Sequence, residues 1–222
     1  IVAGRYDAAI TGVELKNLVL FKEKIYDEIK DLEGKLIIKE YPTRSASLQT
    51  IKNHIDKLRR RDFVPDLIIL DYGDLIRPEN SGREEKRHQL ETIYEELRGM
   101  AQENECPVWT ASQTNRSGLN AEVITMESIS EAFNKCFVAD FIFTVSRTIE
   151  DKNTNTGRIF LAKNRNGPDG LIFPLFMDTS NVKIKVLNQT NESIGDIMEK
   201  SSKDRLDNLK QKYASFKKEQ KE

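Results

Sequence analysis

The chain has few of the residues and patterns that would assign its class at once. Its two cysteines, Cys106 and Cys136, form neither a CxxC pair nor part of a ligand cluster, which excludes a disulfide framework and a zinc centre built from Cys and His. No apolar run approaches the roughly 18 residues needed to span a bilayer, and no signal-peptide pattern opens the chain. These absences predict free thiols and a soluble cytoplasmic protein with no membrane partner.

The net charge of the chain identifies no partner, and the sequence has no phosphate-binding loop. The 35 Lys and Arg residues nearly cancel the 36 Asp and Glu residues, so any basic surface must be local. A nucleotide-phosphate loop requires GxxxxGK followed by Ser or Thr. The sequence has one Gly-Lys pair, Gly34-Lys35, which is followed by Leu36 and has Ile29 where the first glycine belongs. It is not a phosphate loop.

What is present indicates an α/β domain. The 222 residues, 38% of them hydrophobic, are enough for one large core. Apolar spacing predicts a first helix over 11–32, a short strand over 35–39 and a helix that begins after Ser45 or Ser47. Further strands are predicted at 67–70, 107–111, 141–145, 158–163 and 171–176, and further helices at 84–103 and 126–137.

The alternation of strands and helices predicts a mostly parallel sheet flanked by helices. The last two strands, joined by the turn at 166–170, predict a late β-hairpin on the same sheet, so that one mixed sheet holds all the strands. Beyond about 188 the composition becomes charged and polar. We expect this tail to be either a helix that docks on a neighbour or a disordered end.

Asp71 is the first candidate site residue. It ends the apolar run Leu67 to Leu70, and ligands of open parallel sheets gather at the carboxyl ends of strands. A carboxylate there can hold Mg²⁺ through water beside nucleotide phosphates. The alternative is an aspartate that only caps the following turn. Asp74, three residues on, adds little by itself.

Two further candidates follow later strands. Gln113 ends the next strand and can bond a γ-phosphate or the attacking water, or be an ordinary polar loop residue. Lys163 and Arg165 are spaced by one residue, so they face the same side of a strand and suit phosphate charge that develops in a transition state. The alternative for this pair is a solvated surface hairpin.

Basic residues gather in two loops. Arg83, Lys86 and Arg87 follow the flexible Asn80-Ser81-Gly82, and Arg116 follows Gln113. No aromatic residue alternates with the first group. We therefore expect these side chains to contact a nucleic-acid backbone rather than to stack on bases.

In this order the segments LIILDYGDLIRP, SGREEKRHQLETIYEELRGMAQENECPVWTASQTNRS, VADFIFTVSR and LAKNRNGPDGLIFPLF resemble the carboxyl-terminal motor domain of DnaB-type replicative DNA helicases, particularly phage versions. The resemblance runs from about Arg5 to Phe176. Its most specific parts are the strand that ends in SQxNR and the KNRNGPxG hairpin. It implies a partial RecA-like motor domain over 1–187, followed by the tail 188–222.

The resemblance also implies a function and roles for residues. The parent would be a hexameric ring that hydrolyses ATP with Mg²⁺ while translocating on single-stranded DNA, with a primase or a helicase loader as further partners. Asp71 would be the Walker B residue for magnesium and Gln113 the phosphate sensor. Lys163 and Arg165 would reach the nucleotide of the adjacent subunit, with Arg165 as the arginine finger. The loops that carry Arg83, Lys86, Arg87 and Arg116 would line the DNA channel.

The departures from the family are the absent phosphate loop and the absent catalytic glutamate of the strand after it. They imply a fragment that lacks the amino-terminal P-loop strand and is inactive alone, with open sheet edges and a tendency to self-associate. One alternative is a non-hydrolysing RecA-like adaptor that binds a helicase or recombinase ring. Another is an ATPase of the wider RecA-like group that acts in recombination or signalling.

Overall fold

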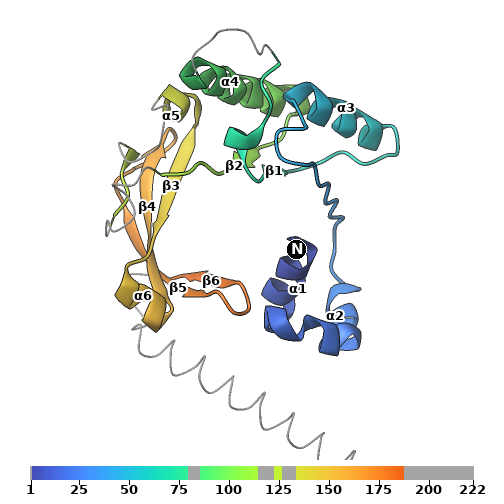
Figure 1. The fold of residues 1–222 in the computed structure, drawn as a ribbon, viewed down its shortest axis with the longest axis vertical. Helices are drawn as coiled ribbons and strands as arrows, with labels where there is room; N and C mark the ends of the chain where they lie inside the picture. Colours follow the sequence, from blue (N-terminus) through green and yellow to red (C-terminus); the bar gives the residue numbers. More distant parts are fainter. Residues whose placement is uncertain (1, 80–85, 115–122, 127–133, 188–222) are drawn as a thin grey trace, which may run out of the picture. The chain divides into compact units, whose positions relative to one another are not determined.

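The computed structural model of the chain describes residues 2–79, 86–114, 123–126 and 134–187 (Figure 1). The chain divides into two compact units. The first contains Ile1–Leu32, Arg147–Ile159 and Phe173–Glu222, and the second contains Glu33–Ser146 and Phe160–Ile172. All described candidate site residues belong to the second unit, whose core and polar clusters position them.

The amino-terminal helical region differs from the expected single helix over 11–32. The structure has helix α1 (Val2–Thr11), the 3-10 helix η1 (Leu15–Phe21) and helix α2 (Lys22–Ile29). Gly12 has φ +67° and ends α1, and its amide donates to the carbonyl of Ala8 at 2.9 Å. A left-handed glycine is the usual end of a helix, so α1, which was not predicted, ends where the predicted helix was to begin.

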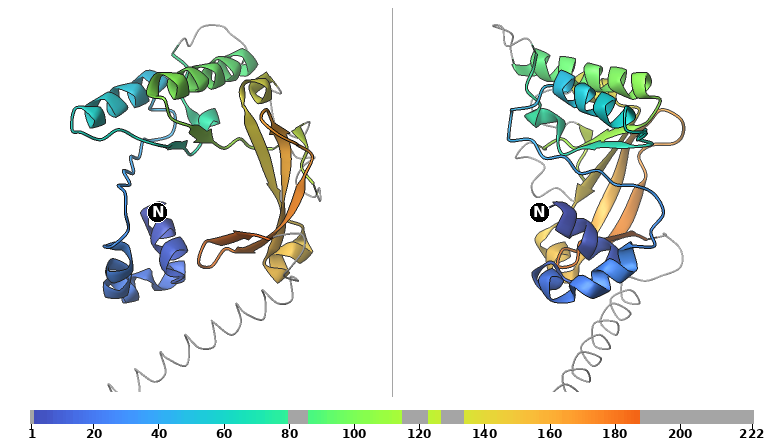
Figure 2. Two further views of the ribbon diagram at one scale, coloured as in Figure 1. Left: turned by 180° about the vertical axis from the view of Figure 1, so that it is seen from behind. Right: turned by 90° about the vertical axis from the view of Figure 1, so that its right-hand side faces the viewer.

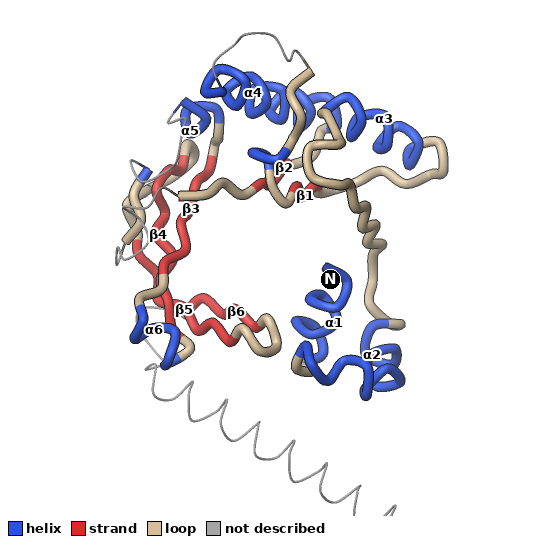
Figure 3. Tube along the Cα trace, viewed as in Figure 1, coloured by secondary structure: helices blue, strands red, loops and turns tan. Residues whose placement is uncertain are grey.

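The strand expected over 35–39 is wrong. This segment is drawn as loop in Figure 3, and Leu36, Ile37 and Ile38 are all exposed. Isolated β-branched residues favour a strand only where a neighbouring strand completes their hydrogen bonds. No strand of the described residues pairs with this segment.

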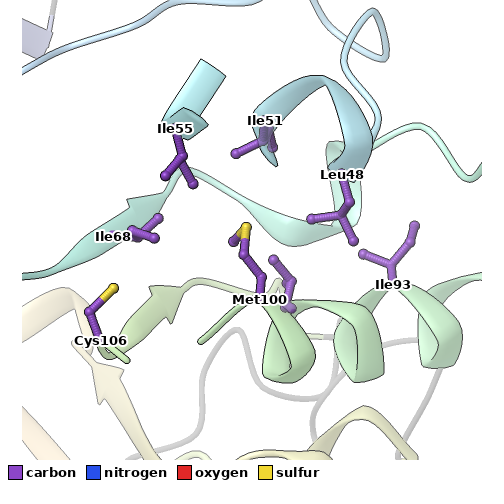
Figure 4. Close-up of a cluster of buried hydrophobic side chains, with 8 residues drawn as sticks. Leu48, Ile51, Ile55, Ile68, Ile93, Met100 and Cys106 are labelled. Atoms are coloured by element: carbon purple, nitrogen blue, oxygen red, sulfur yellow. The ribbon is translucent and has the colours of Figure 1, made fainter. Parts of the chain in front are cut away.

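Helices α3 (Leu48–Arg59) and α4 (Lys86–Asn104) form the main core of the second unit. Ser47 caps α3, as predicted, and shares a capping box with Thr50. Strand β1 (Ile68–Leu70) pairs in parallel with β2 (Val108–Thr110), and Figures 1 and 2 show both helices on one face of this pair. Figure 4 shows the side chains that fill the space between them: Leu48, Ile51, Ile55, Ile68, Ile93, Met100 and Cys106.

The strands do not form one mixed sheet. A second ladder contains β3 (Phe141–Ser146), β4 (Thr156–Asn164), β5 (Ile172–Asp178) and β6 (Lys183–Val186), in that order. Strands β5 and β6 are antiparallel. Within the described residues β2 and β3 share no ladder. They meet instead through aromatic rings, because the Trp109 centroid lies 5.9 Å from Phe141 and 5.7 Å from Phe143.

Three short elements complete the described chain. Helix α5 (Asn134–Val138) overlaps the end of the helix predicted over 126–137, of which residues 127–133 lie outside the described residues. The 3-10 helix η2 (Gly73–Leu75) follows β1, and α6 (Ile149–Thr154) precedes β4. Neither α6 nor β6 was predicted. No helix of the described residues is both long enough and apolar enough to cross a membrane. The tail 188–222 lies outside the described residues.

Candidate functional site

The carboxyl ends of β1 and β2 lie together, because the two strands are parallel and Leu70 is in register with Thr110. Asp71 follows directly after β1 and is exposed. Its peptide bond to Tyr72 is cis. Among the described side chains none donates a hydrogen bond to the Asp71 carboxylate or forms an ion pair with it. As far as the described part of the chain goes, its oxygens are available to an external ligand.

Gln113 lies beside the same turn. Its side-chain amide donates a 2.8 Å hydrogen bond to the hydroxyl of Tyr72, the residue after Asp71. Parallel pairing of β1 and β2 makes this contact possible, because the segments that follow the two strands leave the sheet at the same end. The structure thus brings together the residues predicted at the ends of successive strands.

Asp74 lies in a buried polar cluster that the sequence analysis missed. Its carboxylate accepts hydrogen bonds from Tyr94 at 2.9 Å and from Ser112 at 3.2 Å. Lys135 forms an ion pair with it at 3.2 Å, and the Lys135 side chain is 2% exposed. The oxygens of Asp74 are therefore bonded within the chain, whereas those of Asp71 have no partner among the described side chains.

Tyr94 is held as a neutral donor in this cluster. Burial raises the pKa of its phenol far above the ordinary value, and the neighbouring Asp74 carboxylate raises it further. The Lys135 ammonium lies 5.6 Å from the centre of the Tyr94 ring, within cation–π range. The turn is closed by the Gly73 amide, which donates to the Thr110 hydroxyl at 2.8 Å. Strand β2 thus fixes the turn that carries Asp71.

Lys163 and Arg165 form a second cluster at the end of β4. Lys163 donates to the carbonyls of Cys136 and Phe137 at 2.9 and 3.0 Å, and Arg165 donates to the same Phe137 carbonyl at 2.8 Å. Arg165 also forms an ion pair with Asp140 at 3.0 Å. The predicted placement of both cations on one side is confirmed. The described side chains of this cluster make no hydrogen bond or ion pair with Asp71 or Gln113.

The predicted DNA-contacting residues are only partly described. Arg83 and Arg116 lie outside the described residues, as does the side chain of Lys86, whose backbone begins α4. Arg87, the next residue of α4, is exposed. The DNA-binding role of all four residues stays a prediction.

Comparison with models of protein families identifies the family of this chain. The model of the DnaB-like helicase C terminal domain matches residues 7–184. The chain belongs to this family. The match includes Asp71, Gln113, Lys163 and Arg165, so both polar clusters are parts of a DnaB-like domain.

Curated relatives of this DnaB-like domain are replicative helicases. A DnaB-like replicative helicase of Enterobacteria phage T4 is 33% identical over 129 residues, which are 54% of this chain and 26% of the relative. Replicative DNA helicase DnaB of Geobacillus stearothermophilus is 27% identical over 157 residues, 68% of this chain and 34% of the relative. The chain spans about a quarter to a third of the length of these two relatives.

Solved structures confirm the fold class. A DnaB-like replicative helicase, described with its interactions with primase, superposes with a TM-score of 0.68 at 18% identity, covering 83% of this chain and 48% of that chain. A solved ATPase domain has the same TM-score and identity and is covered to 69% of its length. The RecA-like α/β fold of this DnaB-like domain is thus confirmed, with the predicted late hairpin.

The residues that sequence reasoning missed are Tyr94, Arg98, Lys135 and Asp140. One signal was present: Tyr94 and Arg98 are four residues apart on a predicted helix and therefore share a face. Both side chains are only half-buried, and polar side chains in such positions usually have partners. Their partners lie on other elements, so spacing alone could not name them.

Proposed function

We propose that this DnaB-like domain works in an ATP-driven ring helicase that translocates on single-stranded DNA. In this proposal it contributes residues to two nucleotide sites. Asp71 and Gln113 face the nucleotide of its own subunit, and Lys163 and Arg165 face the nucleotide of a neighbouring subunit. Membership of the DnaB-like family and the replicative helicases among its relatives support the activity.

One observation carries the assignment of the second half-site. Lys163 and Arg165 both donate to the Phe137 carbonyl, so their charged ends lie within reach of one anion. The Arg165 side chain is 45% exposed, and a guanidinium has more N–H donors than its two contacts use. A held and partly exposed arginine beside a lysine suits charge that builds up on a transferring phosphoryl group.

The donor set of the first half-site fits magnesium. Mg²⁺ prefers oxygen ligands and is usually held by one or two carboxylates together with waters and substrate phosphates. Asp71 offers an exposed carboxylate that no described side chain pairs with, whereas Asp74 is paired with Lys135. Asp71 would hold the ion, and bound Mg²⁺ would neutralise charge on the phosphates. Gln113 would orient the attacking water or bond the γ-phosphate.

The residues of this chain are not sufficient by themselves to bind the phosphates of ATP. The printed sequence has no GxxxxGK[ST] loop, so it has no backbone cradle for the β- and γ-phosphates. We expect the 222 residues alone neither to bind ATP with ordinary affinity nor to hydrolyse it. DNA-stimulated ATP hydrolysis by the purified chain, abolished by Asp71→Asn, would contradict this expectation.

A complementation assay tests the second half-site. The chain is mixed with a DnaB-family helicase that has a phosphate loop but whose own finger arginine is replaced by alanine. The expected result is restored ATP hydrolysis, lost with Arg165→Ala in this chain and strongly reduced with Lys163→Ala. Arg158→Ala is the matched control, because Arg158 is paired with Asp151 in the other unit. If hydrolysis survives Arg165→Ala, the finger assignment is wrong.

The partners follow from the same proposal. We expect a homo-hexameric ring, single-stranded DNA in its channel and a primase or a helicase loader on the parent protein. The support for primase is that a solved relative was described with its primase interactions. Analytical ultracentrifugation of the helicase with and without this chain tests whether it enters a ring.

An adaptor that inserts Lys163 and Arg165 into a ring without its own hydrolysis is the second candidate function. It is favoured by the combination of an intact cation pair and no phosphate loop. The coding sequence that precedes Ile1 separates the two candidates. A GxxxxGK[ST] motif encoded there supports the motor, and a start codon without one supports the adaptor.

A further inference from the structure

Arg98 is a third cation at the end of α5, and neither the sequence nor the resemblance assigned it. It extends from α4 and donates to the Val138 carbonyl at 2.6 Å and to the Asp140 carboxylate at 2.8 Å. Asp140 Oδ1 therefore bridges two guanidinium groups, since Arg165 contacts the same oxygen at 3.0 Å. A bridging carboxylate between two arginines fixes the direction of both.

The backbone adds a further contact to the cluster of Arg98, Asp140 and Arg165, here called the clasp. The Arg165 amide donates to the Asp140 carbonyl at 2.9 Å, so Asp140 holds both the main chain and the side chain of Arg165. The turn beyond it is also held, because the Asn164 side chain donates to the Pro168 carbonyl and accepts from the Asn166 amide. The arginine is thus restrained at its root and at its tip.

Charge at the clasp favours an anion. Arg98, Lys163 and Arg165 face one carboxylate, Asp140, and three backbone carbonyls of α5. The Arg98 hydrogen bond lowers the pKa of Asp140, so the carboxylate stays ionised at neutral pH. Burial lowers the pKa of Lys163, the neighbouring Arg165 lowers it further, and Asp140 acts in the opposite direction. A bound phosphate would add negative charge beside these three cations.

We propose that Arg98 and Asp140 are positioning residues that hold the Arg165 guanidinium in the direction it needs to meet a phosphoryl group. This inference rests on the proposed function of Arg165. Neither residue has to touch the nucleotide. Asp140 restrains the guanidinium through one nitrogen, and Arg98 holds the same Asp140 oxygen. The Arg165 donors that Asp140 and Phe137 do not use would bind the phosphate.

Steady-state kinetics in the complementation assay test the inference. Positioning of a group that acts in the transition state affects kcat and not substrate binding, so Asp140→Asn and Arg98→Ala should each lower kcat about ten- to a hundredfold. KM for ATP should change by less than about twofold. Arg98→Lys should recover part of kcat, because a lysine can still donate to Asp140.

The matched control removes a cation from α3. Lys52→Ala breaks the ion pair of Lys52 with Glu103 of α4, which follows Arg98 by five residues on the same helix. It should leave kcat unchanged. Wild-type kcat in Asp140→Asn and Arg98→Ala, or a rise in KM alone, would overturn the inference while leaving the proposed function intact.

A second measurement needs no helicase activity. In the chain alone, the ¹⁵Nε–H group of Arg165 should be ordered on the ps–ns timescale, and it should become as mobile as a free arginine in Asp140→Asn. Equal mobility in both chains overturns the inference. If the wild-type chain restores no hydrolysis but Arg165 is ordered and released as described, the proposed function fails and the clasp stands.

Discussion

Lys135 and Asp74 form a buried ion pair at 3.2 Å, in which the lysine side chain is 2% and the aspartate side chain 17% exposed. Asp74 lies three residues after the strand-end carboxylate Asp71, yet its oxygens are taken by Lys135, Tyr94 and Ser112. The Asp74 carboxylate therefore has a structural role, whereas the Asp71 carboxylate has no partner among the described side chains. The ion pair also joins α5 to the turn that carries Asp71.

Breaking this ion pair should destabilise the chain strongly. Lys135→Met leaves the Asp74 charge buried without its cation and should lower the free energy of unfolding by about 3 kcal/mol. The exposed pair of Lys30 with Asp27 is the control, and Lys30→Met should cost less than about 1 kcal/mol. Urea denaturation followed by circular dichroism measures both. Equal, small losses would show that the buried pair contributes no more than a surface pair.

Gly73 should not tolerate a side chain. A Cβ there would lie 3.2 Å from the Thr110 hydroxyl and 3.2 Å from Cζ and the hydroxyl oxygen of Tyr94. Gly73→Ala should therefore push the turn away from β2 and cost about 1–3 kcal/mol.

Gly99→Ala is the matched control for this change. Gly99 lies inside α4, and a Cβ there meets nothing within 4 Å. Alanine should stabilise this helix by about 0.5–1 kcal/mol. Thermal unfolding of both variants gives the comparison, and a stabilised Gly73→Ala would contradict the close packing of Tyr94 against the turn.

Tyr94 should resist ionisation. Burial and the Asp74 carboxylate raise the pKa of its phenol, so its O–H should remain a hydrogen-bond donor at the pH at which ordinary tyrosines ionise. Titration of tyrosinate absorbance should show one tyrosine fewer ionising in the native chain than after unfolding. Tyr94→Phe should remove that difference. It should also cost about 1–2 kcal/mol, because Asp74 loses a donor.

Acid should weaken the first unit through Asp151. Burial alone would raise the pKa of this carboxyl, but hydrogen bonds from Thr148 and Thr156 and the charge of Arg158 outweigh burial and lower it to about 2. The ordinary value is 3.8. Because the folded value is the lower one, the stabilisation is complete above about pH 4 and is lost as the pH falls toward 2.

The size of this acid effect follows from the shift. A difference of about two pKa units corresponds to roughly 2 kcal/mol of stability. Asp151→Asn should make stability fall less steeply between pH 4 and 2 than it does in the wild type. Urea midpoints across that range measure it, and parallel curves for the two chains would contradict the role of Asp151.

Local patterns predicted several elements correctly because their causes are local. The Ser47 cap, the strands that end before Asp71 and Gln113, and the hairpin with Gly170 at φ +74° each depend on residues within a few positions of one another. The unpredicted α6 also had a local signal. Thr148 and Asp151 form a capping box at its start.

The prediction of a single sheet failed for a non-local reason. Strand order depends on which distant edges meet, and in the described residues β2 and β3 meet through Trp109, Phe141 and Phe143 without a shared ladder. The strand over 35–39 failed similarly, because propensity gives no strand without a partner edge.

The sequence by itself determined the family and the α/β class, and it predicted the four site residues Asp71, Gln113, Lys163 and Arg165, since motif order and strand-end polarity are properties of short segments. Only the tertiary structure decided that Asp74 is paired while Asp71 has no partner among the described side chains, and that Arg98 and Asp140 contact one another beside Arg165. The deciding contacts join residues 61 positions apart in Lys135 and Asp74 and 42 apart in Arg98 and Asp140. Such pairs form only when helices and strands pack, so no local pattern encodes them.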